Sequence, residues 1–191
     1  MTSSTTPAWH RIVGRGAALL ATAFAVPTVV LFVAGALGLA WSDTPARSVF
    51  DIVVLVVMLG GAWQLTSTPV VSVLWRVVVS AAIVVALLGA VLRIGGPSWV
   101  DVVITWAHWL SYADDVVQTL VALLAWQIER RVQGRASPMW AVTIALQTPP
   151  LLARLVPLTM TMVVAIGAVG VLRVLVLAVA LVLLRSRLRR C

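Results

Sequence analysis

The chain has 191 residues, of which 62% are hydrophobic and only 10% are charged. A soluble domain carries about 25% charged residues, so this composition excludes an ordinary soluble protein and predicts an all-α, polytopic transmembrane bundle. The net charge of +8 comes from arginines that flank apolar segments, which argues against a nucleic-acid partner. The sequence contains no lysine, which excludes Schiff-base chemistry with retinal or pyridoxal phosphate, and we predict no cofactor.

Long apolar segments predict about six membrane-spanning helices, because about 20 apolar residues cross a bilayer. The first three helices are expected at about residues 17–40, 49–66 and 70–94. Residues 1–16 precede them as a predicted N-terminal cytoplasmic segment. Arg76, near the cytoplasmic end of the third helix, is interpreted as a structural residue whose long side chain reaches the membrane surface.

The fourth helix is expected within residues 99–128, and it carries most of the chain's polar chemistry. Six polar residues recur at spacings of three or four along one helical face: Asp101, Thr105, His108, Tyr112, Asp115 and Thr119. Ser111, Asp114 and Gln118 widen this stripe. Two structures fit the pattern.

In the first structure, residues 99–128 form one long, tilted helix of about 45 Å, whereas the hydrocarbon layer is about 30 Å thick. His108, Asp114 and Asp115 then line a polar cavity that opens outward. In the second, which we prefer because of this length mismatch, the chain breaks near Ser111. Residues 99–110 then form a short interfacial helix.

In this second structure Ser111 caps the transmembrane helix, and Asp114 follows three residues later as in a capping box. Asp101 becomes a residue of the membrane boundary. A metal site is not predicted on this helix, because Asp101, His108 and Asp115 follow one another at intervals of one heptad, about 10 Å. A single ion with ligands near 2 Å cannot bridge that distance.

The last two helices are expected at about residues 139–155 and 158–184, followed by a basic cytoplasmic tail at 185–191. Pro149 and Pro150 each lack a backbone donor, so they disturb the fifth helix or simply end it. Arg154, just beyond them, suits an outer boundary. Residues 17–184 therefore form a single transmembrane domain.

Arg173 lies near the middle of the sixth helix, where a charge costs at least about 2.5–3.5 kcal/mol to insert. Its side chain should lean toward the start of its own helix. Asp114 or Asp115 is then its candidate partner. The alternatives, of similar weight, are carbonyl groups freed near Pro149 and Pro150, or a side chain that reaches the surface.

The arginines predict the orientation. One side of the six-helix arrangement carries Arg11, Arg15, Arg130, Arg131, Arg135, Arg185, Arg187, Arg189 and Arg190. The other side carries only Arg47, Arg93 and Arg154. The positive-inside rule makes the first side cytoplasmic, so both termini are expected inside, most simply at the cell membrane.

Three functions remain open from the sequence. The first is a non-enzymatic accessory or interaction subunit, whose partners are the lipid bilayer and other membrane subunits or further copies of itself. The second is a small-solute or ion transporter component with an outward-facing polar cavity between the fourth, fifth and sixth helices, lined by His108, Asp114, Asp115 and Arg173. A distant third is a membrane enzyme that uses His108 with Asp114 or Asp115 for acid–base chemistry.

Overall fold

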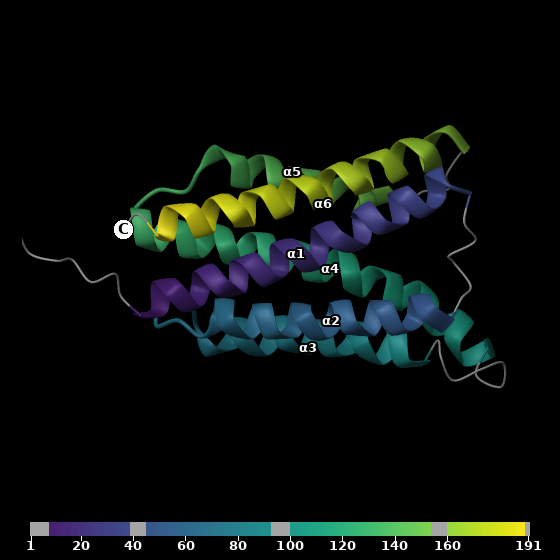
Figure 1. Ribbon diagram of the computed structural model, residues 1–191, viewed down its shortest axis with the longest axis horizontal. Coiled ribbons are helices and arrows are strands. Elements are labelled where there is room, and N and C mark those ends of the chain that lie inside the picture. Colours follow the sequence, from purple (N-terminus) through teal and green to yellow (C-terminus); the bar gives the residue numbers. More distant parts are fainter. Residues whose placement is uncertain (1–7, 39–44, 93–99, 154–159, 190–191) are drawn as a thin grey trace, which may run out of the picture.

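The computed structural model describes residues 8–38, 45–92, 100–153 and 160–189. These ranges contain six α-helices and no strand, which confirms the all-helical prediction. The helices are α1 (Ala8–Ala36), α2 (Pro45–Thr66), α3 (Val73–Leu92), α4 (Val100–Gln133), α5 (Pro138–Ala153) and α6 (Met160–Leu188) (Figure 1).

Several helices extend beyond the boundaries expected from apolar composition. Helix α1 begins at Ala8 rather than near residue 17, and α6 continues to Leu188 rather than ending near 184. The added turns contain arginine, which is a good helix former, so a change from apolar to charged residues does not end a helix. The predicted segments at 1–16 and 185–191 are therefore partly helical.

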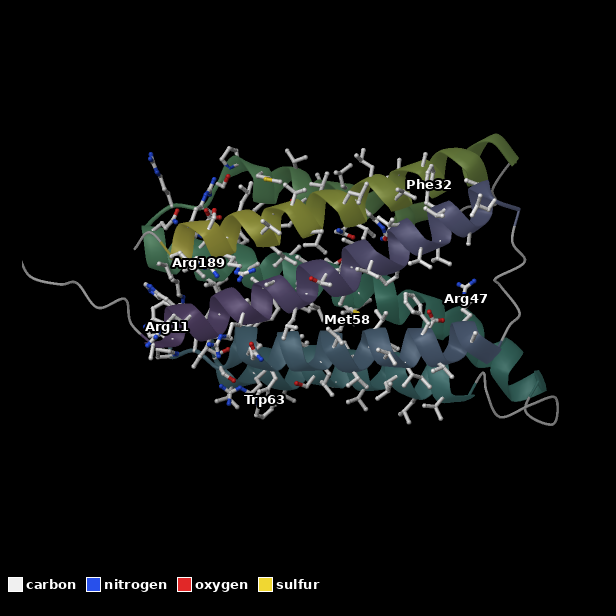
Figure 2. The ribbon with its side chains drawn as sticks, viewed as in Figure 1. Arg11, Phe32, Arg47, Met58, Trp63 and Arg189 are labelled. Carbon is white, nitrogen blue, oxygen red and sulfur yellow. The ribbon has the colours of Figure 1, made fainter. Side chains whose placement is uncertain are left out.

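Successive helices run in opposite directions and pack against one another, and α6 closes the arrangement by packing on α1 (Figure 1). Helix α4 also contacts α6, with α5 packed against both. The start of α1 and the end of α6 lie at the same end of the bundle. Figure 2 places Arg11 and Arg189 at this end and Arg47 at the opposite end.

Helices α1 and α2 approach closely where two glycines face each other. A Cβ atom added at Gly16 would lie 2.7 Å from the Gly61 carbonyl oxygen and 2.8 Å from the Leu65 nitrogen. A Cβ at Gly61 would lie 3.1 Å from the Gly16 carbonyl oxygen. Small residues that let backbones approach are typical of helix contacts in membranes.

Three stretches of the described residues are long and apolar enough to cross a membrane: Ala8–Ala36, Val49–Thr66 and Ala168–Leu188. Helix α3 holds a shorter apolar segment, Val73–Leu88. Large apolar side chains also lie on the outer surface, including Leu74 at 71% exposure and Phe32 at 67%. Exposed apolar area of this kind suits contact with lipid or with another protein.

Helix α4 corrects the preferred interpretation of the polar segment. It continues without interruption from Val100 to Gln133, so the expected break near Ser111 is wrong. The helix sequence has neither proline nor glycine, so no backbone constraint ends it, and the capping preferences of Ser111 and Asp114 are overridden. One long helix, the first of the two structures considered, is the one that forms.

Helix α5 also continues through a point where the sequence suggested a disturbance or an end. It continues through Pro149 and Pro150 and ends at Ala153. Because Pro149 and Pro150 have no N–H group, the carbonyls of Ala145 and Leu146 lose their usual i+4 donors, yet the helix continues to Ala153. The double proline does not break the helix.

Candidate functional site

A buried polar cluster links α4, α5 and α6. Arg173 Nη2 donates a hydrogen bond to Asp115 Oδ1 in an ion pair, and Arg173 Nη1 donates to Gln147 Oε1 at 3.4 Å. The three residues are 8%, 2% and 1% exposed, respectively. Of the alternatives considered for Arg173, the structure contains the pairing with an acid of the fourth helix, and that acid is Asp115.

The same cluster contains polar atoms that no described residue satisfies. Arg173 Nε and Gln147 Nε2 are buried and lack a hydrogen-bond partner within the described ranges. A buried donor without a partner costs about 1–3 kcal/mol. The cluster could therefore offer hydrogen bonds to water or to a small polar solute.

A second cluster, around a buried carboxylate, links the same three helices nearer the arginine-rich end. The carboxylate of Glu129 is 1% exposed and accepts hydrogen bonds from Arg187 Nη1 and Trp140 Nε1. The backbone amide of Ser137 also donates to Glu129 Oε2, at 3.4 Å. Sequence reasoning missed this cluster, because Glu129 directly precedes Arg130 and Arg131 and resembles a solvated boundary residue.

The two ion pairs have the same separation along the chain. Asp115 and Arg173 are 58 residues apart, and so are Glu129 and Arg187. Helices α4 and α6 therefore run parallel in one fixed register. The two acids on α4 are two heptads apart, about 21 Å along the helix, and so are the two arginines on α6. The buried residues Ala122 and Ala180 lie midway between the charges on α4 and α6.

The regular spacing is the signal that could have identified Glu129. Two acids two heptads apart on α4 match two arginines two heptads apart on α6. Residues at heptad spacing share one face of a helix that packs against a parallel neighbour.

Arg76 contacts the end of α2 and does not simply extend to the surface. Its Nη2 donates to the Thr66 carbonyl oxygen at 3.0 Å, and its guanidinium lies 5.3 Å from the centre of the Trp63 ring. It thereby satisfies a carbonyl at the end of α2 and fixes the connection between α2 and α3.

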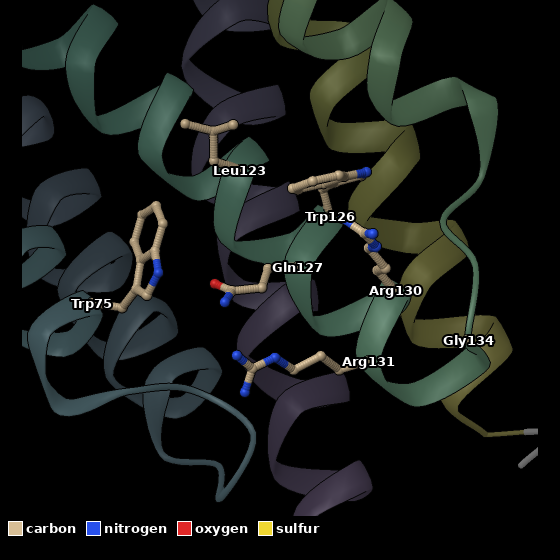
Figure 3. Close-up of a pocket in the computed structure, with 7 residues that line it drawn as sticks. All are labelled: Trp75, Leu123, Trp126, Gln127, Arg130, Arg131 and Gly134. Carbon is tan, nitrogen blue, oxygen red and sulfur yellow. The ribbon is translucent and has the colours of Figure 1, made fainter.

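A cavity of about 460 Å³ lies between α3 and α4 at the arginine-rich end (Figure 3). Trp75, Trp126 and Gln127 line it together with two arginines. Arg130 lies 5.5 Å from the centre of the Trp126 ring, and Arg131 Nη1 donates to the Val70 carbonyl oxygen at 2.9 Å. Both arginines thus already have interactions within the protein.

Several predicted site residues have side chains outside the described part of the structure: Asp101, His108, Ser111, Asp114, Pro149, Pro150 and Arg154. The backbone of α4 carries Asp101, His108, Ser111 and Asp114. Among the described residues, no group of three or more His, Cys, Asp or Glu could hold a metal ion.

Comparison of the chain with known protein families, with curated proteins and with solved structures finds no match. Its function must therefore be inferred from its own residues.

Proposed function

We propose that this protein is an integral membrane bundle that serves as a non-enzymatic interaction or accessory subunit, in a cell membrane and with both termini in the cytoplasm. The observation that carries this proposal is the use of its buried carboxylates. Asp115 and Glu129 each bind an arginine of α6. Their charges therefore hold three helices in one register and leave little free charge for chemistry on a substrate.

Membrane insertion with six crossings is part of this proposal. Three segments have the length and hydropathy for it, and the antiparallel order of the six helices supports the remaining crossings. Arginines at the ends of α4 and α6 and at the start of α1 gather on one side. The positive-inside rule then assigns that side to the cytoplasm.

The test is extraction of the full-length chain from its native membrane in mild detergent, followed by native mass spectrometry. We expect a complex with another polypeptide, or with further copies, at a fixed stoichiometry. A charge-swapped variant, Asp115→Arg with Arg173→Asp, is the matched control, because it keeps an ion pair between α4 and α6. It should retain the complex. A chain that is always recovered as a lone polypeptide contradicts the proposal.

A second candidate function, a transporter component, is favoured by the unpartnered donors on Arg173 and Gln147. In a transporter, His108 and Asp114 would extend a polar pathway along α4 from these donors. A membrane enzyme that uses His108 and Asp114 has no support from a described contact. The swapped variant separates the two functions in liposomes that contain a pH-sensitive dye. A proton-coupled pathway predicts proton flux in the wild type and its loss in the swapped variant. Wild-type liposomes as tight as empty ones count against that pathway.

A further inference from the structure

A separate basic cavity lies between the first turns of α1 and the last turns of α6. Its volume is about 450 Å³. Its lining includes four arginines and one histidine: Arg11, Arg15, Arg185, Arg189 and His10. The two ion-paired arginines of α6, Arg173 and Arg187, do not line it.

The positive charge of this cavity is not balanced by the described protein. The lining contains no acidic side chain, and none of the described acids forms an ion pair with these four arginines. Glu129, a buried acid near the same end, is already bound by Arg187 and Trp140. A concave surface with one sign of charge concentrates ions of the opposite sign.

His10 supplies an independent indication of a missing ligand. It is 7% exposed and lines the cavity, and its buried Nδ1 has no hydrogen-bond partner among the described residues. The Trp9 ring packs edge-on against the imidazole, with ring centres 3.9 Å apart, and so limits its orientation. An anion that accepts a hydrogen bond from Nδ1 would satisfy this nitrogen.

The close contact between α1 and α6 brings the arginines together. A Cβ atom at Gly14 would lie 3.5 Å from Cγ of Arg185, so the stem of this arginine packs directly over α1. The guanidinium groups of both helices consequently border one cavity. Guanidinium groups bind phosphate oxygens through paired, charge-assisted hydrogen bonds.

We propose that this cavity binds the phosphate group of an anionic phospholipid headgroup. The four arginines supply its counter-charge and His10 supplies a directed hydrogen bond. The cavity lies where apolar helices pass into an arginine-rich end, which is where headgroups meet a protein in a bilayer. Its volume is in the range of ligand pockets rather than of a single water site. Inorganic phosphate shares this chemistry and must be tested beside the lipid.

The experiment uses the full-length protein in phosphatidylcholine nanodiscs with increasing phosphatidylglycerol, and native mass spectrometry counts the bound lipid. We expect saturable binding of phosphatidylglycerol. The double variant Arg15→Gln/Arg189→Gln should weaken it by about tenfold or more, since each arginine near an anionic headgroup contributes substantially to binding. His10→Phe should weaken binding several-fold while the thermal unfolding midpoint stays within a few degrees of the wild type.

The matched control is Arg130→Gln/Arg135→Gln, which removes the same charge at the same end but outside this cavity. It should change phosphatidylglycerol binding by less than about twofold. An equal loss in both double variants would show attraction by surface charge alone and would overturn the site. Saturable binding of inorganic phosphate without binding of phosphatidylglycerol would overturn the lipid assignment. Unchanged binding in His10→Phe would overturn the proposal, because the site requires the directed hydrogen bond from His10.

Discussion

The two halves of this bundle are held together by different means. Helices α4, α5 and α6 share two clusters of charged and polar side chains, centred on the buried carboxylates of Asp115 and Glu129. Helices α1 and α2 meet instead through the backbones of Gly16 and Gly61. In a bilayer, an apolar side chain gains little free energy when it exchanges contact with lipid for contact with a neighbouring helix. Close packing and polar contacts therefore determine which helices associate.

The two kinds of contact respond differently to substitution. An ion pair between long side chains can accommodate small shifts, but it leaves a buried charge if either partner is lost. A glycine contact has no charge to expose, but it leaves no space for even one methyl group. Substitutions should therefore affect the two halves in different ways, and three of them test this difference.

The largest effect is expected at the Asp115–Arg173 pair. Arg173→Met leaves a buried carboxylate without its cation, which should reduce the free energy of unfolding by about 3–5 kcal/mol. The measurement is unfolding in mixed micelles with increasing denaturing detergent.

The double variant Asp115→Leu/Arg173→Met should recover most of this loss, because replacing a whole buried ion pair with apolar residues is often nearly neutral. Equal losses in the single and double variants would show that the two charges are not coupled. That result would contradict the statement that an ion pair holds α4 against α6.

A smaller effect is expected at the glycine contact. Gly16→Ala places a methyl group against the backbone atoms of Gly61 and Leu65, which cannot move without separating α1 from α2. Overpacking of this kind costs about 1–3 kcal/mol. Gly60→Ala is the control, since a Cβ there meets nothing within 4 Å. The same unfolding assay should show no more than about 0.5 kcal/mol of change in the control; equal effects at Gly16 and Gly60 would refute the close contact.

The smallest effect is expected from Trp140→Phe. This change removes one donor from Glu129 but leaves Arg187 in place. A hydrogen bond to a charged group contributes about 1.5–3 kcal/mol, and the remaining ion pair should limit the loss to about 1 kcal/mol. Trp63→Phe, at a position 55% exposed, should cost less, because phenylalanine keeps an aromatic face for Arg76 and no hydrogen bond to a buried carboxylate is lost. A neutral Trp140→Phe would mean that the indole does not stabilise the Glu129 carboxylate.

The sequence predicts the Asp115–Arg173 cluster better than the Glu129 cluster for a physical reason. A lone arginine in an apolar helix requires a partner, and few acids are present. Glu129 has arginines beside it in the sequence, and its actual partner lies on a turn of α6 beyond the apolar segment. The sequence also predicts six helices, whereas apolar composition and capping preferences misplace their ends, because arginine extends a helix and α4 has no proline or glycine to interrupt it.

The equal separation of the two ion pairs limits how the chain can change its length. One residue inserted between Asp115 and Glu129 would rotate the end of α4 by about 100° and direct Glu129 away from Arg187. Inserting seven residues into α4 would require seven more in α6 to keep both pairs. Changes in the connection between α5 and α6 need no such match. The lengths of α4 and α6 between the two ion pairs are therefore constrained. An insertion in one of these helices requires an equal insertion in the other, although the two are distant in the sequence.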